Sequence, residues 1–342
     1  MDLNLSGEQQ QLVDAFGALY AKESSTERVR AAEPLGHDPN LWARLKENGA
    51  VEMAVDEDSG GSGASLLDLA LVAEQHGRYL GPAPLVEAQV AARLLARIGS
   101  DAARKALAPV LDGTRLVTMA LHPPPAGVLP LVPAGAVCDD VIFLDGRRIA
   151  LFTPDTKRQA VGNIGSLPLA DLEVPASMVV LASGEGAERL FEEARREWMI
   201  LMANALVGIG TRSIEIGVEY VKERKAFGVP IGTFQAVSHG LAAAVTAVEG
   251  GMLLAREAAW SAEVEPERTP ELAPLAFGFN AESAREASYR SLHYHGGYGF
   301  MVEYDIQLYF RRAKAWPSQF VEPDVAFGQA AAHRLAAAAK GA

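Results

Sequence analysis

The sequence predicts a mostly helical α+β protein built from three consecutive segments. Residues 1–112 and 183–342 carry apolar side chains at helical spacing, whereas residues 113–182 carry short β-prone runs separated by turns rich in proline and glycine. A chain of 342 residues also exceeds the size of one ordinary domain. We therefore expect an N-terminal helical domain (1–112), a small, reduced middle β domain (113–182) and a C-terminal four-helix bundle (183–342).

The N-terminal segment contains clear helix boundaries. Ser6 with Gln9 three residues later forms a capping-box pattern, which predicts the start of the first helix. A second helix is predicted from Leu41 to Asn48, with Gly49 at its C-terminal end. A loop over residues 56–63 then precedes a third apolar helical run.

The middle and C-terminal segments differ in the spacing of their apolar residues. Strands are predicted at residues 114–121, 137–144 and 148–152, with Asp145-Gly146 as a hairpin turn. Long helices are predicted at about 186–225, 233–263, 270–292 and 303–315, and a last helix follows Phe327. A helix as long as the first of these implies a bundle.

Composition excludes several classes of function. A formal net charge of -12 disfavours binding to nucleic acid or to an anionic membrane, which both require a basic surface. Cys138 is the one cysteine and the histidines lack zinc-site spacing, so neither a disulfide nor a metal site is expected. No leader-like N-terminal pattern or uncharged membrane-spanning stretch is visible, and we expect a cytoplasmic protein.

Two segments suggest a dinucleotide site. The first predicted long helix ends at Arg224, and a guanidinium there suits a pyrophosphate, while Phe227 could contact a flat ring. Roughly sixty residues later, three glycines offer bare backbone amides, at Gly296, Gly297 and Gly299. Taken singly, these features also fit a solvated helix-end arginine and an ordinary turn between helices.

Both segments resemble the acyl-CoA dehydrogenase family, whose flavoenzymes carry R-x-x-F-G-x-P-I-x-x-F-Q and Q-x-x-G-G-x-G in this order. A third match, in the N-terminal segment, comprises Leu41–Gly49, Gly60–Gly63 and Glu74–Arg78. The resemblance implies that flavin adenine dinucleotide (FAD), held mainly by a neighbouring subunit, is contacted by Arg224, Phe227, Gln235, His293, Gly296, Gly297 and Gly299. His293 stands where the family usually has glutamine, so one hydrogen bond replaces a two-point amide contact.

The family's catalytic base is missing from its expected positions. The family abstracts an α-proton from an acyl thioester with a glutamate while the β-hydrogen leaves as hydride to FAD. Counting seven residues beyond Ala313 gives Phe320, and counting twenty-six back from Arg224 gives Trp198. Glu322 and Glu197 are neighbours, but a shift of one residue rotates a helical side chain by about 100°. The catalytic residue therefore stays unassigned.

The flavin-side element of the β domain is also changed. Where the family carries a pattern resembling T-E-x-x-x-G-S-D, this chain has Ala120–Gly127, in which three consecutive prolines remove backbone donors. We read this stretch as a rigid, polyproline-like turn. The retained elements are those with which a subunit contacts the flavin bound by its neighbour. This division resembles the smaller, non-catalytic subunit of actinobacterial heterotetrameric acyl-CoA dehydrogenases.

Three hypotheses follow from the resemblance. The first is an accessory subunit that completes the FAD site of a catalytic paralogue, for dehydrogenation of a fatty or sterol-derived acyl-CoA, with electron-transfer flavoprotein as a candidate redox partner. The second is a self-sufficient homo-oligomeric acyl-CoA dehydrogenase with Glu197 or Glu322 as a displaced base. The third is a non-catalytic binding or scaffold protein. Visible absorption of the chain alone and with a partner discriminates among them.

Overall fold

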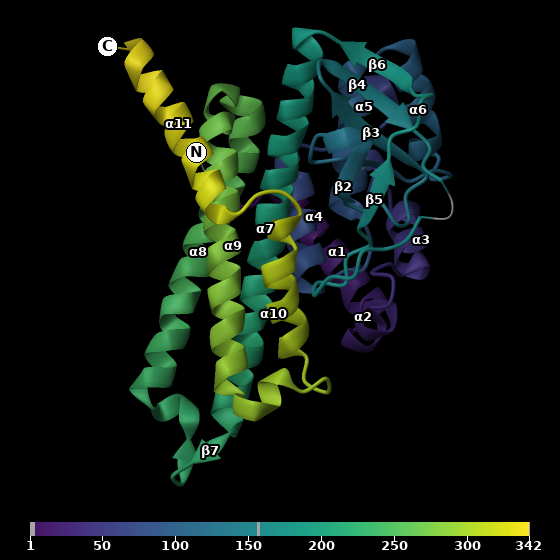
Figure 1. The fold of residues 1–342 in the computed structure, drawn as a ribbon. Helices are drawn as coiled ribbons and strands as arrows, with labels where there is room; N and C mark the ends of the chain where they lie inside the picture. Colours follow the sequence, from purple (N-terminus) through teal and green to yellow (C-terminus); the bar gives the residue numbers. More distant parts are fainter. Residues whose placement is uncertain (1–3, 156–157, 342) are drawn as a thin grey trace. The chain divides into compact units, whose positions relative to one another are not determined.

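The computed structural model describes residues 4–155 and 158–341, and helices dominate it (Figure 1). The α-helices are α1 (Gly7–Glu23), α2 (Thr26–Ala32), α3 (Pro39–Glu47), α4 (Leu66–Arg78), α5 (Leu85–Ile98), α6 (Asp101–Leu111), α7 (Glu185–Glu223), α8 (Gln235–Val264), α9 (Thr269–Tyr294), α10 (Ile306–Ala315) and α11 (Pro323–Gly341). The strands are β1 (Val117–Met119), β2 (Val128–Val132), β3 (Asp140–Asp145), β4 (Arg148–Phe152), β5 (Ala170–Glu173), β6 (Val179–Ser183), β7 (Lys225–Ala226) and β8 (Val229–Pro230). The predicted mostly helical α+β fold is confirmed.

Packing divides the chain into two compact units. Unit 1 contains α1, residues 70–81 with most of α4, and the chain from residue 199 onward, and unit 2 contains residues 27–69 and 82–198. Helix α7 begins in unit 2 and continues into unit 1. The sequence-based domain boundaries at residues 112 and 182 describe a different division and stay a prediction.

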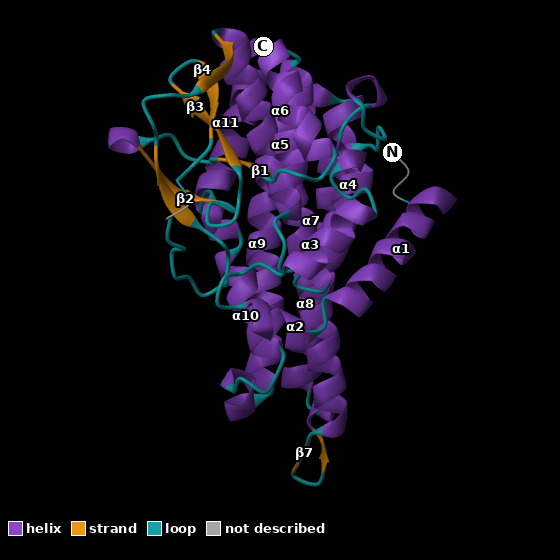
Figure 2. Ribbon diagram, turned by 90° about the vertical axis from the view of Figure 1, so that its right-hand side faces the viewer, coloured by secondary structure: helices purple, strands orange, loops and turns teal. Residues whose placement is uncertain are grey.

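Unit 2 combines small sheets with helices α5 and α6. One sheet has the strand order β1-β3-β4-β6, with β1 and β3 parallel and the other pairs antiparallel, and β2 pairs with β5 alone (Figure 2). Helix α5 packs against α6 and β1. The predicted hairpin is confirmed, since Asp145 pairs with Arg148 across a turn in which Gly146 has φ 57°.

Strands β2, β5 and β6 were not predicted. Strand β2 contains Pro130, a residue that argues against a strand because it cannot donate to the ladder. The structure accommodates it because β2 has a single partner strand and the register shifts between Leu129 and Val132. The reduced β domain therefore holds more strand than its sequence indicates.

The predicted boundaries of the N-terminal helices agree with the structure. The amide of Gln9 donates to Ser6 Oγ at 3.1 Å, and the Gln9 side chain accepts from the Ser6 amide at 3.0 Å, which completes the capping box of α1. Helix α3 is followed by Gly49 at φ 68°, a conformation that favours glycine.

The C-terminal helices form the predicted bundle in unit 1, where α8, α10 and α11 each pack on α9. Helix α4 lies against α7 through two glycines that allow close backbone approach. A Cβ atom on Gly77 would lie 1.8 Å from the Ala205 carbonyl oxygen, and one on Gly208 would lie 2.0 Å from that of Glu74. These positions therefore require glycine.

Helices α7 and α8 are long and apolar enough to span a membrane by length and composition alone. The apolar window of α7 is 78% buried in the protein, as expected for a core helix. The corresponding window of α8 is only 28% buried. Helix α8 therefore presents an apolar surface that this chain does not cover.

Candidate nucleotide-binding site

A small hairpin after α7 carries the first predicted binding residues. Strands β7 and β8 are joined by Phe227 and Gly228, with φ values of 54° and 84°, as a two-residue type I′ turn requires. A phenylalanine rarely adopts positive φ, and the side chain of Phe227 is 95% exposed. The turn holds an aromatic ring in solvent at a cost in backbone strain.

Arg224 and Gln235 flank this hairpin and are both exposed. The Arg224 amide donates to the Tyr220 carbonyl at 2.9 Å, which continues the α7 hydrogen-bonding pattern by one residue. Within the described part of the chain, no acidic side chain forms an ion pair with the Arg224 guanidinium. Its donors are therefore available to an anionic ligand.

The three predicted glycines lie in a 3-10 turn, Gly296–Phe300, that follows α9. Gly299 is needed for packing, because a Cβ there would lie 2.3 Å from the Leu292 carbonyl oxygen. Gly296 is needed for conformation, with φ 61°. Gly297 meets neither requirement, since a Cβ would touch nothing within 4 Å and its φ is not positive. Open space above Gly297 leaves room for the close approach of a ligand.

The hairpin and the glycine turn meet at one end of unit 1 (Figure 1). The Tyr220 hydroxyl donates to the His295 carbonyl at 3.4 Å, and the Tyr294 hydroxyl donates to the Ala236 carbonyl at 3.4 Å. Burial raises the pKa of Tyr220, and the nearby charge of Arg224 opposes that rise. Tyr220 therefore links the end of α7 to the residue before the glycine turn, and Tyr294 links the end of α9 to the start of α8.

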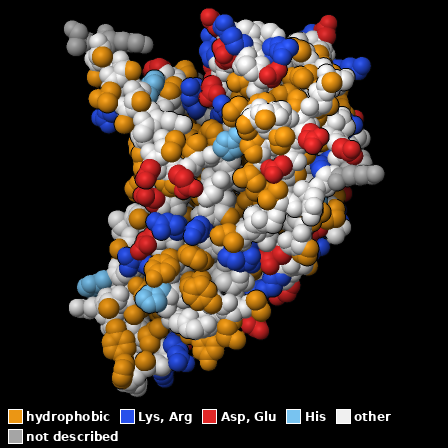
Figure 3. Space-filling model, in the orientation of Figure 1, with side chains coloured by type: hydrophobic (Ala, Val, Ile, Leu, Met, Phe, Trp, Pro, Cys, Tyr) orange, Lys and Arg blue, Asp and Glu red, His pale blue; other side chains and the backbone are white. Residues whose placement is uncertain are grey.

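Apolar side chains are exposed over the same end. Figure 3 shows hydrophobic side chains gathered at the end of the molecule where Figure 1 places β7. The large exposed side chains of the hairpin and the glycine turn are Phe227, Val229, Phe234, Tyr298, Phe300, Met301 and Val302. Clusters of this kind typically mark a contact surface for a ligand or another chain.

His293 is exposed on the last turn of α9, with its ring 5.8 Å from Tyr289 and 6.1 Å from Tyr294. It lies beside the glycine turn, as its place in the motif requires. The assignments of Arg224, Phe227, Gln235, His293 and the three glycines as FAD contacts stay predictions.

The residues present fit the nucleotide half of FAD better than its flavin ring. The exposed guanidinium of Arg224 and the open backbone at Gly297 suit a pyrophosphate and its nucleoside. The segment expected to bond the flavin edge offers little, because its prolines lack amide hydrogens. The prediction of a polyproline-like turn over Ala120–Gly127 is wrong in detail, since Pro125–Gly127 form a 3-10 turn with Ala126 at φ 53°.

The two expected base positions hold large apolar side chains in the structure. Trp198 is fully buried in α7, and Phe320 follows the 3-10 turn Pro317–Gln319. Neither side chain can accept a proton from a substrate. The neighbouring carboxylates Glu197 and Glu322 are therefore the candidates for a displaced base.

Glu197 is bound between two arginines of α5. Its carboxylate accepts from Arg93 Nε at 3.3 Å and Arg93 Nη2 at 3.2 Å, and it is also bonded to Arg97. Burial alone would raise the pKa of Glu197, but the two guanidinium groups outweigh it and hold that pKa below its usual value. A carboxylate bound in this way is a poor general base, because a base in a dry pocket needs a raised pKa.

Glu322 is exposed and lies at the rim of a cavity of about 150 Å³ that Arg285 and Lys314 also line. An exposed carboxylate lacks the desolvation that an acyl-CoA dehydrogenase base requires. The structure thus offers no physical support for either displaced base.

Sequence reasoning missed a second buried carboxyl group, Glu87 on α5. Its Oε1 accepts from Trp198 Nε1 at 3.4 Å, and burial raises the pKa of Glu87. No arginine bonds it within the described chain. The available signal was a single acidic residue inside the run Leu85–Ala92, where every residue is buried.

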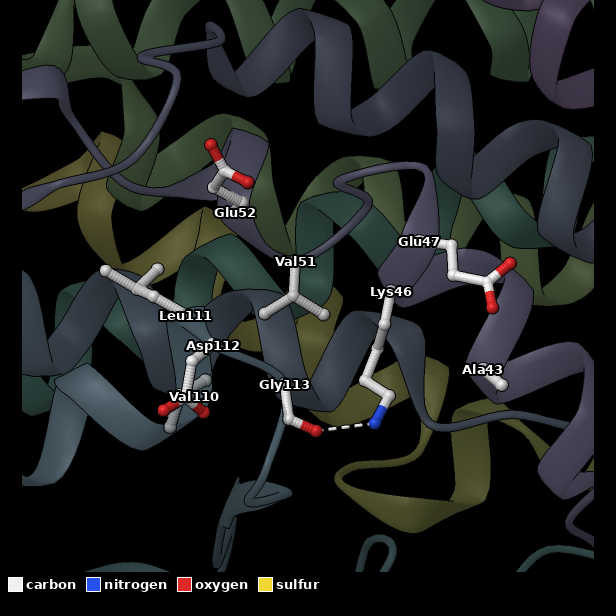
Figure 4. Close-up of a pocket in the computed structure, with 9 residues that line it drawn as sticks. All are labelled: Ala43, Lys46, Glu47, Val51, Glu52, Val110, Leu111, Asp112 and Gly113. Carbon is white, nitrogen blue, oxygen red and sulfur yellow. Dashed lines mark hydrogen bonds between the residues drawn. The ribbon is translucent and has the colours of Figure 1, made fainter.

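The surface groove on unit 2 lacks convergent polar groups. Its volume is about 300 Å³, and Lys46 Nζ donates to the Gly113 carbonyl at 2.5 Å (Figure 4). The carboxylates of Glu47 and Glu52 point in different directions in Figure 4. Binding sites bring a few polar groups together around a ligand, so we assign no function to this groove. In residues 4–155 and 158–341 no cluster of three metal-ligating side chains occurs.

The family is established by comparison with known proteins. The model for "Acyl-CoA dehydrogenase, N-terminal domain" matches residues 6–114, and that for "Acyl-CoA dehydrogenase, C-terminal domain" matches residues 184–317. Acyl-CoA dehydrogenase IpdE2 of Mycolicibacterium smegmatis is 32% identical over 312 residues, which cover 90% of this chain and 93% of that protein. The chain belongs to the acyl-CoA dehydrogenase family, and FAD is confirmed as the cofactor at the level of the family.

Solved structures give the same fold. The structure described as "Tcur3481-Tcur3483 steroid ACAD G363A variant" is 25% identical with a TM-score of 0.86, covering 97% of this chain and 99% of that one. The ChsE4-ChsE5 complex from Mycobacterium tuberculosis is 23% identical with a TM-score of 0.84, covering 99% of this chain and 98% of that one. The second likeness shows the fold alone.

Proposed function

We propose that this chain is the accessory subunit of a mixed acyl-CoA dehydrogenase, in which it completes the FAD site of a catalytic paralogue. One contrast carries the proposal. Arg224 and Phe227, which would reach a neighbour's cofactor, are exposed: Arg224 forms no ion pair with the described residues, and Phe227 has a strained φ of 54°. The base positions, by contrast, hold Trp198 and Phe320. The chain thus keeps binding groups and lacks the proton acceptor.

In this role each retained residue binds rather than reacts. Arg224 supplies charge-assisted hydrogen bonds to the pyrophosphate, and the glycine turn supplies backbone amides and space. Bound FAD supplies the hydride acceptor, and the paralogue supplies the carboxylate that removes the α-proton. Loss of a positioned base typically lowers the rate by about 10²–10⁴, so this chain alone should show little turnover.

The exposed face of α8 supports a mixed oligomer. Ala242, Thr246 and Gly250 recur every four residues along this face, and all three are exposed. Small side chains at this spacing let another helix approach closely along the i±4 ridges. A second chain packed there would cover the apolar window that this chain leaves open.

The relatives indicate the kind of acyl group. The 25% identical structure is that of a "steroid ACAD" variant, and we therefore propose a bulky, sterol-derived acyl-CoA ester as the substrate of the complex. Electron-transfer flavoprotein, as the oxidant that accepts electrons from FAD, remains part of this proposal.

The proposal can be tested by co-expressing this chain with a catalytic homologue and measuring flavin absorption near 450 nm relative to the amount of protein. We expect a colourless chain alone and a yellow complex. Arg224→Ala should weaken FAD binding by the complex about 10- to 100-fold, since a hydrogen bond to a charged group contributes about 1.5–3 kcal/mol. Arg285→Ala provides a matched control, because Arg285 is also exposed and forms no ion pair within the described chain.

Two outcomes would contradict the proposal. A yellow, active homo-oligomer that loses turnover on Glu197→Gln or Glu322→Gln would identify a self-sufficient enzyme. A complex whose FAD content is unchanged by Arg224→Ala would favour a scaffold that does not contact the cofactor.

A further inference from the structure

Three consecutive large apolar residues lie in solvent at the end of the glycine turn. The side chains of Phe300, Met301 and Val302 are 71%, 44% and 70% exposed. Runs of this kind are rare on the surface of a soluble protein unless they contact a ligand or another chain. We call these three residues the apolar run.

Hydrogen bonds hold the apolar run in a defined conformation. The Met301 amide donates to the Tyr298 carbonyl at 3.0 Å, and the Tyr304 amide donates to the Met301 carbonyl at 3.1 Å. Met301 itself has φ -76° and ψ 142°, an extended conformation without strain. The three side chains are therefore exposed on an ordered segment, as a contact surface requires.

Met301 differs from the other described methionines in its exposure. Met252 on α8 is only partly exposed, and four more are buried: Met53, Met119, Met199 and Met202. A thioether is oxidised only where the oxidant can reach its sulfur. Among the described methionines, Met301 is therefore the one most accessible to a dissolved oxidant.

The position of the apolar run indicates what covers it. The run directly follows Gly299, the last glycine of the turn that would contact the cofactor of the catalytic paralogue. A turn that reaches a cofactor held by another subunit brings the next three residues close to that subunit. The paralogue is therefore the partner that would bury the apolar run.

We propose that Met301 is a site of reversible oxidation by hydrogen peroxide, and that its sulfoxide opposes assembly with the catalytic paralogue. The thioether sulfur attacks one peroxide oxygen, so that a sulfur–oxygen bond forms and the oxygen–oxygen bond breaks. The sulfur loses two electrons, and the second oxygen leaves as water after taking up the proton. This inference rests on the proposed function, because assembly with the paralogue is the event that it regulates.

The physical effect follows from the polarity of the product. A thioether is apolar and flexible, whereas a sulfoxide is polar and accepts hydrogen bonds. Burying an unpaired polar group in an apolar interface should weaken binding of the paralogue about tenfold or more. Methionine sulfoxide reductases restore the thioether, so the effect is reversible.

Peptide mass spectrometry of the full chain after brief treatment with hydrogen peroxide tests the oxidation itself. We expect Met301 to be oxidised before Met252 and before the buried methionines. In the co-expressed complex, Met301 should be oxidised more slowly than in the free chain. Equal rates at Met301 and Met252, or equal Met301 rates in the complex and the free chain, would overturn the inference.

Assembly is tested by treating this chain alone, removing the peroxide and then titrating it with the catalytic paralogue. Affinity should fall about tenfold or more and return after treatment with a methionine sulfoxide reductase. Met301→Leu, which conserves volume, should assemble normally and resist peroxide, whereas Met301→Gln should assemble poorly without it. Met252→Leu is the matched control and should stay sensitive to peroxide.

Loss of assembly by peroxide-treated Met301→Leu would overturn the inference, and so would unchanged assembly of a chain oxidised at Met301. An untreated chain that forms no complex with the paralogue would instead refute the proposed function.

Discussion

Two buried glutamates of unit 2 should respond in opposite ways when each is replaced by glutamine. Glu197 is ionised and bonded to Arg93 and Arg97, whereas Glu87 is bonded to the indole of Trp198 and has a raised pKa. The substitutions Glu197→Gln and Glu87→Gln are isosteric and lie on neighbouring helices. They form a matched pair that differs mainly in the ion pairs removed.

The expected magnitudes follow from burial. The side chain of Glu197 is 6% exposed, and its partners Arg93 and Arg97 are 13% and 30% exposed. Removing one partner of a buried ion pair costs about 3–5 kcal/mol. The partial exposure of Arg97 places our expectation near the lower end, at about 3 kcal/mol. Glu87 accepts one hydrogen bond, from the Trp198 indole, which the amide oxygen of glutamine can also accept, so Glu87→Gln should change the free energy of unfolding by about 1 kcal/mol or less.

The pH dependence has opposite signs for the two residues. The lowered pKa of Glu197 means that its stabilisation is complete above pH 4.5 and is lost as the pH falls through the folded-state value. The raised pKa of Glu87 means that its contribution is complete below pH 4.5 and is lost as the pH rises through the folded-state value. Glu87→Gln should therefore become more stable relative to the unmodified chain with rising pH.

Urea unfolding at pH values from below 4.5 up to 8, followed by circular dichroism, measures the pH dependence of both variants. Turnover of the co-expressed complex, corrected for folded protein, should be unchanged by either substitution, because neither carboxylate acts as the base. A Glu197→Gln chain as stable as the original but inactive in the complex would refute the reasoning, since it would show that the Arg93 and Arg97 bonds contribute little and that Glu197 is catalytic.

Three further predictions concern single positions. Burial lowers the pKa of His76 to about 4, so acid should weaken the fold by about 3 kcal/mol between pH 6.5 and 4, and His76→Gln should flatten that dependence in urea titrations. Gly77→Ala places a methyl group 1.8 Å from the Ala205 carbonyl oxygen and should destabilise the fold by about 3 kcal/mol. Gly250→Ala meets open space and should stabilise the isolated chain by about 0.5–1 kcal/mol, so equal melting temperatures of the two variants would contradict this reasoning. Phe227→Asn should raise the free energy of unfolding by about 1 kcal/mol and lower the FAD content of the complex, and a less stable variant would argue against strain at φ 54°.

Local features were predictable because they depend on neighbouring residues. The capping box at Ser6 and the turn at Gly146 involve residues a few positions apart, so their patterns are visible in the sequence. The long C-terminal helices were predictable from periodicity. Strands such as β2 were not, because their pairing partners lie about forty residues away and override the local effect of proline.

The site could be predicted only as far as its residues follow a linear motif. The spacing from Arg224 to Gln235 indicated the hairpin end of the bundle, but nothing local indicated that Arg93 would bind Glu197, 104 residues later. The state of a carboxyl group is set by such distant partners and by burial. Glu197 therefore looked like a candidate base until its two arginines were visible.

The isolated chain carries costs that only a second chain can offset. Phe227 holds a positive φ with its ring in water, and α8 leaves most of an apolar window uncovered. Stability alone would favour asparagine or glycine in the turn and polar residues on that face. Residues that oppose the stability of a monomer are typically retained where they contribute to binding. A partner that covers the Phe227 ring and the apolar window of α8 would bury this apolar surface and so stabilise the complex. Cofactor content should therefore be measured on the assembly rather than on the isolated chain.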